Sequence, residues 1–152
     1  MPELTFRAAR REDVRTIIEL TLGGAVMTLA DDPADWESDE YQTAFAAIEA
    51  DPNNQIVLGE MEGEVVATMQ ITFIPGIMRR GMTRALLENI HVRESRRGKG
   101  IGSAMIRHAI ELAQRRGCRL VQLTSNKKRT EAHRFYGRLG FEPSHEGFKL
   151  YL

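Results

Sequence analysis

The stretch that most constrains the fold is Arg-Arg-Gly-Lys-Gly-Ile-Gly-Ser, at residues 96–103. An apolar run over residues 85–92 precedes it, and a long run with helical apolar periodicity, residues 101–113, follows it. This order predicts a strand, a glycine-rich turn and the start of a helix. Glycines allow the backbone to approach a ligand closely, and the first amides of a helix attract anions. Because the turn also carries three cations, we expect it to bind a diphosphate.

The composition is typical of a globular protein, and we expect one domain over residues 1–152. The formal net charge is zero, which argues against nucleic acid as a partner. The one cysteine, Cys118, excludes a disulfide framework and fits a reducing cytoplasm. No signal segment, membrane-spanning run or metal-ligand spacing is present, so we expect a cytoplasmic protein with neither a membrane partner nor a metal.

Charge is distributed unevenly along the chain. Residues 30–51 contain eight acidic side chains and no Lys or Arg. Residues 93–138 contain thirteen basic side chains and three acidic ones. These runs fit either two solvated faces or a basic half that binds an anionic cofactor beside an acidic arm near a cationic group.

Periodicity and turn signals predict a mixed α/β (α+β) fold with a mostly antiparallel sheet. The expected elements are strands at residues 4–8, 55–61, 64–73, 83–92 and 120–124, helices that begin near 11 and 38 and that span 100–116 and 130–139, and a closing hairpin of residues 141–142 and 147–152. The crossover through the glycine-rich turn predicts that strands 83–92 and 120–124 are parallel.

Two common nucleotide-binding motifs do not fit the turn. Gly98, Gly100 and Gly102 have G-x-G-x-G spacing, which differs from the G-x-G-x-x-G of dinucleotide sites. Lys99 is not followed by the Ser or Thr of a Walker A motif. A purely structural turn would not need so many cations.

The stretch from Arg97 to Gly102 does match another pattern, the R-x-x-G-x-G acetyl-CoA motif, so the chain resembles the GNAT superfamily of N-acetyltransferases. The closing segment Phe-Tyr-Gly-Arg-Leu-Gly-Phe, residues 135–141, resembles a later motif of that superfamily at the right separation. Residues 123–145 also show a narrower similarity to the aminoalkylphosphonate N-acetyltransferase branch. The resemblance implies helices on both faces of a sheet that splays between the strands ending near Val92 and Thr124.

The resemblance also implies acetyl-CoA as cosubstrate. Its pantetheine arm would bind the backbone of the first splayed strand, its diphosphate would bind the amides of the glycine-rich turn, and an Asn after the second strand would contact the pantetheine amides. The residues implied are Ile90, Val92, Arg97, Gly98, Lys99, Gly100, Ile101, Gly102, Ser103 and Asn126.

Direct acetyl transfer to an amine needs a base for the ammonium and an acid for the departing thiolate. Glu88 is the expected base, because a carboxylate buried in an apolar strand is costly without a partner or a role, and because the superfamily often places a catalytic acid in such an E-x-x-x-V strand. Tyr136 matches the superfamily's acid; the alternative is a core aromatic. His91 and a water relay are rival bases, although strand alternation places His91 opposite Glu88 unless a bulge intervenes.

The acceptor is expected to be a primary amine of a small molecule. Arg79, Arg80 and Arg84 could hold an anionic tail, such as that of an aminoalkylphosphonate, and Trp36 could border the amine. The alternatives are acetylation of a protein or peptide, and a non-catalytic acyl-CoA-binding sensor. Because many members of the superfamily pair through their C-terminal strands, we also expect a homodimer.

Overall fold

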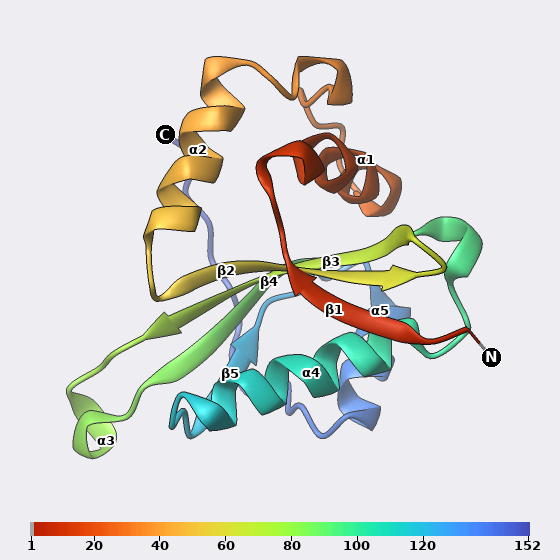
Figure 1. Ribbon diagram of the computed structural model, residues 1–152. Helices are drawn as coiled ribbons and strands as arrows, with labels where there is room; N and C mark the ends of the chain where they lie inside the picture. Colours follow the sequence, from red (N-terminus) through yellow and green to blue (C-terminus); the bar gives the residue numbers. More distant parts are fainter. Residues whose placement is uncertain (1) are drawn as a thin grey trace.

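The computed structural model describes residues 2–152 and shows one five-stranded sheet between two helical layers (Figure 1). The strands are β1 (Leu4–Ala8), β2 (Asn54–Met61), β3 (Glu64–Ile74), β4 (Arg84–Val92) and β5 (Leu120–Leu123), and they lie side by side in chain order. Neighbouring strands are antiparallel except for β4 and β5, which are parallel. The expected mixed sheet and its parallel crossover are therefore confirmed.

Helices cover both faces of the sheet, as expected. They are α1 (Val14–Gly24), α2 (Asp39–Ala50), α3 (Met78–Gly81), α4 (Ile101–Arg115) and α5 (Thr130–Arg138), with short 3-10 turns η1 (Arg11–Asp13), η2 (Pro33–Asp35) and η3 (Glu94–Arg96). In Figure 1, α1 and α2 lie above the sheet, and α4 and α5 lie below it. None of the helices in the described part of the chain is both long and apolar enough to cross a membrane.

The main hydrophobic core lies between the sheet and α4. Met69, Leu87 and Met105 each expose at most 1% of their surface, and they belong to one continuous apolar cluster. α4 contributes to this cluster because its apolar side chains recur on one face of the helix. The lower layer therefore holds β3, β4 and the start of α4 in a fixed arrangement.

The upper layer has a smaller core. Val14, Ile18 and Phe45 are buried there, with Trp36 packed against them. The guanidinium carbon of Arg11 lies 5.3 Å from the centre of the Trp36 ring, a cation–π distance. Since Trp36 contributes to this core, its place is between α1 and α2.

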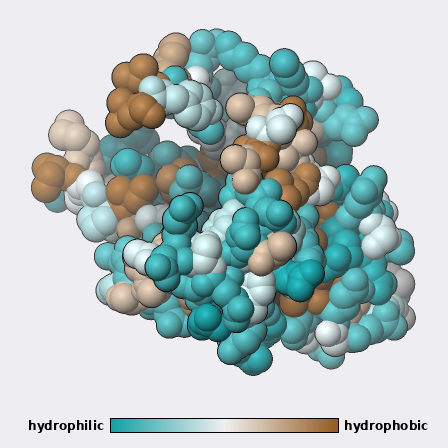
Figure 2. All heavy atoms as spheres, turned by 90° about the horizontal axis from the view of Figure 1, so that it is seen from above, coloured by the Kyte–Doolittle hydropathy of each residue, from teal (hydrophilic) through white to brown (hydrophobic). Residues whose placement is uncertain are grey.

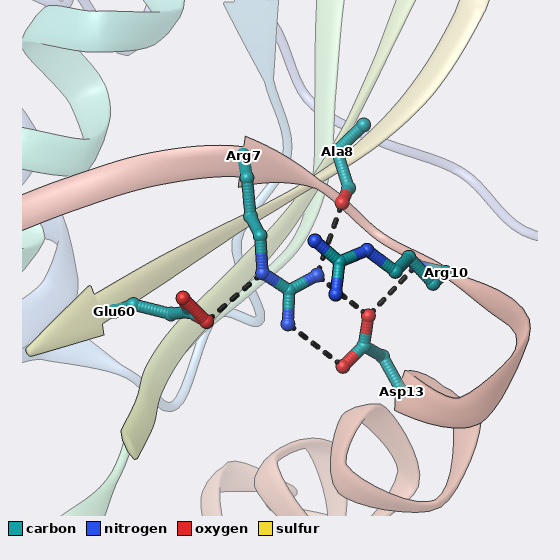
Figure 3. A network of polar contacts seen from close by, with 5 residues as sticks. All are labelled: Arg7, Ala8, Arg10, Asp13 and Glu60. Atoms are coloured by element: carbon teal, nitrogen blue, oxygen red, sulfur yellow. Dashed lines mark hydrogen bonds and ion pairs between the residues drawn. The ribbon is translucent and has the colours of Figure 1, made fainter. Parts of the chain in front are cut away.

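A polar network joins the start of the upper layer to the sheet (Figure 3). Arg7 of β1 donates two hydrogen bonds to Asp13, of 2.7 and 2.9 Å, and a third, of 2.9 Å, to Glu60 of β2. Burial alone would raise the pKa of the Asp13 carboxyl, but the hydrogen bonds from Arg7 and from the Arg10 amide outweigh it and lower that pKa. Two-pronged pairing of this kind is strong and directional, so it fixes where α1 begins.

The expected closing hairpin is wrong. Residues 141–152 contain no regular secondary structure, and every residue from 142 onward is exposed. Phe148 and Leu150 expose 90% and 87% of their surface. The apolar side chains that suggested a strand are exposed and do not pack on the described part of the chain, so they do not stabilise a strand there.

Candidate active site

A β-bulge in β4 organises the candidate site. Glu88 pairs with Gln70 of β3 and His91 pairs with Thr68, so β4 contains one more residue than β3 across this interval. Asn89, in the bulge, has a left-handed backbone with φ of 52°. Because paired residues share a face, and Gln70 and Thr68 lie two apart in β3, the bulge places Glu88 and His91 on the same face. Strand alternation alone predicts opposite faces for these two side chains, and the bulge reverses that prediction.

That face is the one covered by α1 and α2, and Glu88 is exposed on it. The expectation that Glu88 is buried is therefore wrong. Ala85 and Leu87 of β4 are buried in the lower core, and strand alternation places Glu88 on the opposite face, where it is exposed. The side chain is accessible to a dissolved substrate.

His91 has a different environment. Burial, with the added positive charges of Arg129 and Arg97, lowers the pKa of its imidazole to about 4. An imidazole with this pKa is neutral at pH 7 and is a weaker base than an ordinary histidine. His91 therefore fits poorly the role of rival base that the sequence suggested.

β4 and β5 separate beside this bulge. Their pairing runs from Arg84 with Leu120 to Leu87 with Leu123 and then stops, although β4 continues to Val92. The predicted splay is thus present. A hollow of about 230 Å³ opens where the strands part. Its lining includes side chains from β4, the end of β5, α5 and the C-terminal segment: Glu88, His91, Thr124, Arg129, Tyr136 and Lys149.

Tyr136 lines this hollow from α5 and is also part of the main core. Its ring packs edge-to-face against Phe135 and Phe141, with centroids 5.2 and 5.9 Å away. Burial raises the pKa of the Tyr136 phenol, and Arg129 partly offsets that rise. The phenol is therefore protonated at neutral pH. Tyr136 therefore belongs to the core and also lines the hollow, so its place in the core does not exclude a role as proton donor.

The glycine-rich turn leads from this hollow into α4. Gly98 and Gly100 have φ of 75° and 79°, values that residues with a Cβ rarely adopt. Gly100 is the N-cap of α4, whose first turn presents backbone amides without helical partners. At Gly102 a Cβ would lie 3.3 Å from Phe135, so a glycine there allows α5 to pack close to α4. A diphosphate fits such a turn.

The other residues of the turn differ in what they offer. Lys99 is exposed, whereas the Ile101 side chain is 2% exposed and belongs to the core, leaving only its backbone for a ligand. Arg97 donates hydrogen bonds to the backbone carbonyls of Val92 and Gly23, at 3.2 and 3.1 Å. Arg97 thus ties the turn to β4 and to α1.

Asn126 lies in the loop after β5, where the sequence placed it. Its Oδ1 accepts a 2.9 Å hydrogen bond from the backbone amide of Lys128, and its carbonyl lies 2.9 Å from His133 Nε2. These bonds shape the loop. The neighbouring Ser125 hydroxyl is buried and has no hydrogen-bond partner among residues 2–152, which leaves it available to a polar ligand atom.

The C-terminal end of α1 closes over the bulge, a contact that the sequence analysis missed. Asn89 Nδ2 donates a 2.8 Å hydrogen bond to Thr21 Oγ1, and Asn89 Oδ1 lies 3.1 Å from His91 Nε2. A Cβ on Gly24 would lie 2.3 Å from His91 Nδ1. The available signal was an Asn beside Glu88 in an apolar strand, since Asn tolerates left-handed backbone.

Within residues 2–152, no group of three or more His, Cys, Asp or Glu side chains is placed to hold a metal ion.

Comparisons with known proteins point to one family. The model of the acetyltransferase (GNAT) family matches residues 25–141. The chain is 31% identical over 148 residues to the aminoalkylphosphonate N-acetyltransferase of Salmonella typhimurium, which covers 97% of this chain and 91% of that protein.

Solved structures have the same fold. A Bacillus halodurans C-125 protein described as a transcriptional regulator superposes with a TM-score of 0.89 at 36% identity, covering 99% of this chain and all of that one. A predicted acetyltransferase from Clostridium acetobutylicum, solved with acetyl-CoA, superposes with a TM-score of 0.74 at 18% identity, covering 98% and 96% of the two chains. The second likeness shows the fold alone.

The packing of α1 on His91 predicts different effects for two adjacent glycines. Gly24→Ala places a methyl group against the His91 ring and should lower the free energy of unfolding by about 1–3 kcal/mol. Gly23→Ala is the control, because a Cβ there meets no atom within 4 Å. Urea unfolding of both variants measures the difference. The Gly24→Ala, His91→Ala double variant should recover part of the loss, and equal stability of the two single variants would contradict this packing.

Proposed function

The chain belongs to the acetyltransferase (GNAT) family, and we propose that its residues 1–152 form one N-acetyltransferase domain that acetylates the primary amine of a small molecule. As a member it is an acetyl-CoA-dependent acyltransferase. The observation that carries the proposal is the shared hollow at the splay of β4 and β5, which is lined by a solvent-exposed carboxylate, Glu88, and a buried phenol, Tyr136.

For the cosubstrate we propose the residues that the sequence pattern named. The edge of β4 at Ile90 and Val92, which β5 leaves open, would bind the pantetheine arm as an added strand does, although the Val92 carbonyl already accepts a hydrogen bond from Arg97. The amides from Gly98 to Ser103 would bind the diphosphate, with Lys99 supplying charge. Asn126 would contact the pantetheine from the loop after β5. Arg97 would act mainly by holding the turn, since its guanidinium already binds two carbonyl groups.

Acetyl-CoA supplies the acetyl group as an activated thioester. Glu88 accepts a proton from the acceptor's ammonium group, which frees the nitrogen lone pair to form the new C–N bond. The nitrogen loses its second proton to solvent as the amide forms. Tyr136 donates its proton to the sulfur as the C–S bond breaks, so the departing group leaves as a thiol. Because burial raises the pKa of the Tyr136 phenol, the phenol holds its proton at neutral pH and has it available when the sulfur takes negative charge.

We propose that the acceptor carries an anionic group, as the name of the Salmonella relative suggests. Arg129 and Lys149 line the hollow and would pair with that group. The sequence suggested Arg79, Arg80 and Arg84 for this role, but Arg79 and Arg80 belong to α3 at the far tip of the β3–β4 hairpin (Figure 1), and Arg84 is the first residue of β4 after that tip. The structure does not bring them to the hollow.

We also propose a homodimer in the cytoplasm. The exposed apolar side chains of the C-terminal segment and the open edge of β5 are the kind of surface that a second copy covers. Lys149, which lines the hollow, lies in the same segment, so dimer formation would affect the geometry of the proposed active site. The single cysteine, Cys118, is a free thiol, as in a reducing compartment.

Tyr136→Phe keeps the ring and removes only the hydroxyl. We expect turnover to fall about 10²- to 10⁴-fold, the range of a lost general acid, with little change in acetyl-CoA binding. Thiol release with an amine panel measures turnover, and calorimetry measures binding. Phe141→Tyr, on the other ring packed against Tyr136, is the matched control for packing. Unchanged turnover in Tyr136→Phe would remove this residue from the mechanism.

Glu88→Gln removes the base and keeps the shape of the side chain. We expect most activity to be lost near pH 7 and to return as pH rises, because at higher pH the acceptor amine is deprotonated in solution and needs no base on the protein. A pH profile of kcat/KM for both proteins tests this. Glu94→Gln is the control, because Glu94 is also an exposed glutamate and lies shortly before the glycine-rich turn. A variant profile that coincides with the parent's excludes Glu88 as the base.

The homodimer is tested by light scattering coupled to gel filtration. The full chain should have twice the monomer mass, and Phe148→Ser with Leu150→Ser should shift it toward the monomer. Glu146→Ser is an exposed control that changes no apolar surface. A monomeric parent protein at micromolar concentration contradicts the proposal.

A further inference from the structure

A second cavity, of about 210 Å³, lies between α1 and α2 above the sheet. Its walls are apolar side chains of the two helices, among them Ile17, Leu22, Phe45 and Ile48, and its floor is Ile56 of β2. Figure 2 views the molecule from above and shows a hollowed centre with brown apolar side chains beside it. For comparison, an apolar cavity of about 150 Å³ holds a benzene ring.

The polar groups of this cavity are already paired with one another. The Tyr41 hydroxyl donates a 2.6 Å hydrogen bond to Asp31 Oδ1. Asn89 Nδ2 donates to Thr21 Oγ1 at 2.8 Å. With these donors used, the surface that remains for an occupant is mainly hydrocarbon. An apolar occupant loses little hydrogen bonding on entry and gains by leaving water.

The cavity adjoins the candidate active site. Asn89 lines both the cavity and the hollow that contains Tyr136. Ile56 pairs with Gln70, which pairs with Glu88, so the cavity floor and the proposed base lie in one row across three strands. Two strand spacings separate them, about 10 Å. A molecule whose amine lies at Glu88 can therefore place a side group of a few carbon atoms in the cavity.

We propose that the acceptor is an amine with an apolar side group, an alkyl chain or a phenyl ring a few bonds from the nitrogen, and that this group fills the cavity between α1 and α2. The inference rests on the proposed acetyl transfer at Glu88. The acidic Asp31 at the cavity wall disfavours an anionic group there, so the anionic end of the acceptor points the other way, toward Arg129 and Lys149.

The test is a series of α-aminoalkylphosphonates whose side chain is hydrogen, methyl, propyl or phenylethyl, so that charge is constant and only apolar size changes. We expect kcat/KM to rise about two- to fourfold per added carbon until the cavity is filled. Ala44→Leu, which narrows the cavity from α2, should abolish this rise. Ala47→Leu, exposed on the same helix and outside the cavity, should keep it.

The melting temperature is measured with the same compounds, so that binding is read without turnover. If kcat/KM is flat or falls with side-chain size while acetyl transfer is detected, the cavity proposal is overturned and acetyl transfer stands. If no compound is acetylated but stabilisation grows with side-chain size in the parent and not in Ala44→Leu, the cavity proposal stands and the acetylation of these amines fails. The absence of both effects overturns both proposals.

Discussion

The candidate site depends on one extra residue in β4. At the bulge, Asn89 takes a left-handed backbone, which costs conformational energy for most residues and less for Asn. In return, Glu88 and His91 face the same side of the sheet, and the strand bends as it leaves β5. Without the bulge, an alternating strand would turn one of these two side chains into the lower core. The placement of both Glu88 and His91 beside the hollow follows from it.

The C-terminal end of α1 holds the bulge in place, on the face of the sheet where we place the acceptor. Thr21 binds Asn89, Gly24 packs on His91, and Gly23 accepts a hydrogen bond from Arg97. The end of α1 therefore contacts both the strand and the glycine-rich turn that we assign to the cosubstrate. The two helical layers thus differ in role. α4 and the lower core hold the strands of the sheet in place, while the thinner layer of α1 and α2 surrounds a cavity above the sheet.

The glycine-rich turn and the order of the elements could be predicted because they rest on local signals. A left-handed N-cap at Gly100 and a parallel crossover need only the residues around them. The shared face of Glu88 and His91 could not be predicted, because the bulge depends on pairing with β3, which Asn89 alone does not specify. The closing hairpin was wrong for a related reason. Alternating apolar residues suggested a strand at residues 147–152, but a strand needs a partner, and this segment pairs with no strand in the described part of the chain.

The most direct test of the central claim, that acetyl-CoA binds where β4 and β5 part, is a nuclear magnetic resonance titration of the backbone amides with acetyl-CoA. The proposed site predicts the largest shifts at residues 90–92 and 98–103 and at Tyr136, with small shifts in β1. Saturating acetyl-CoA that leaves residues 90–92 and 98–103 unshifted while it moves amides elsewhere would contradict it.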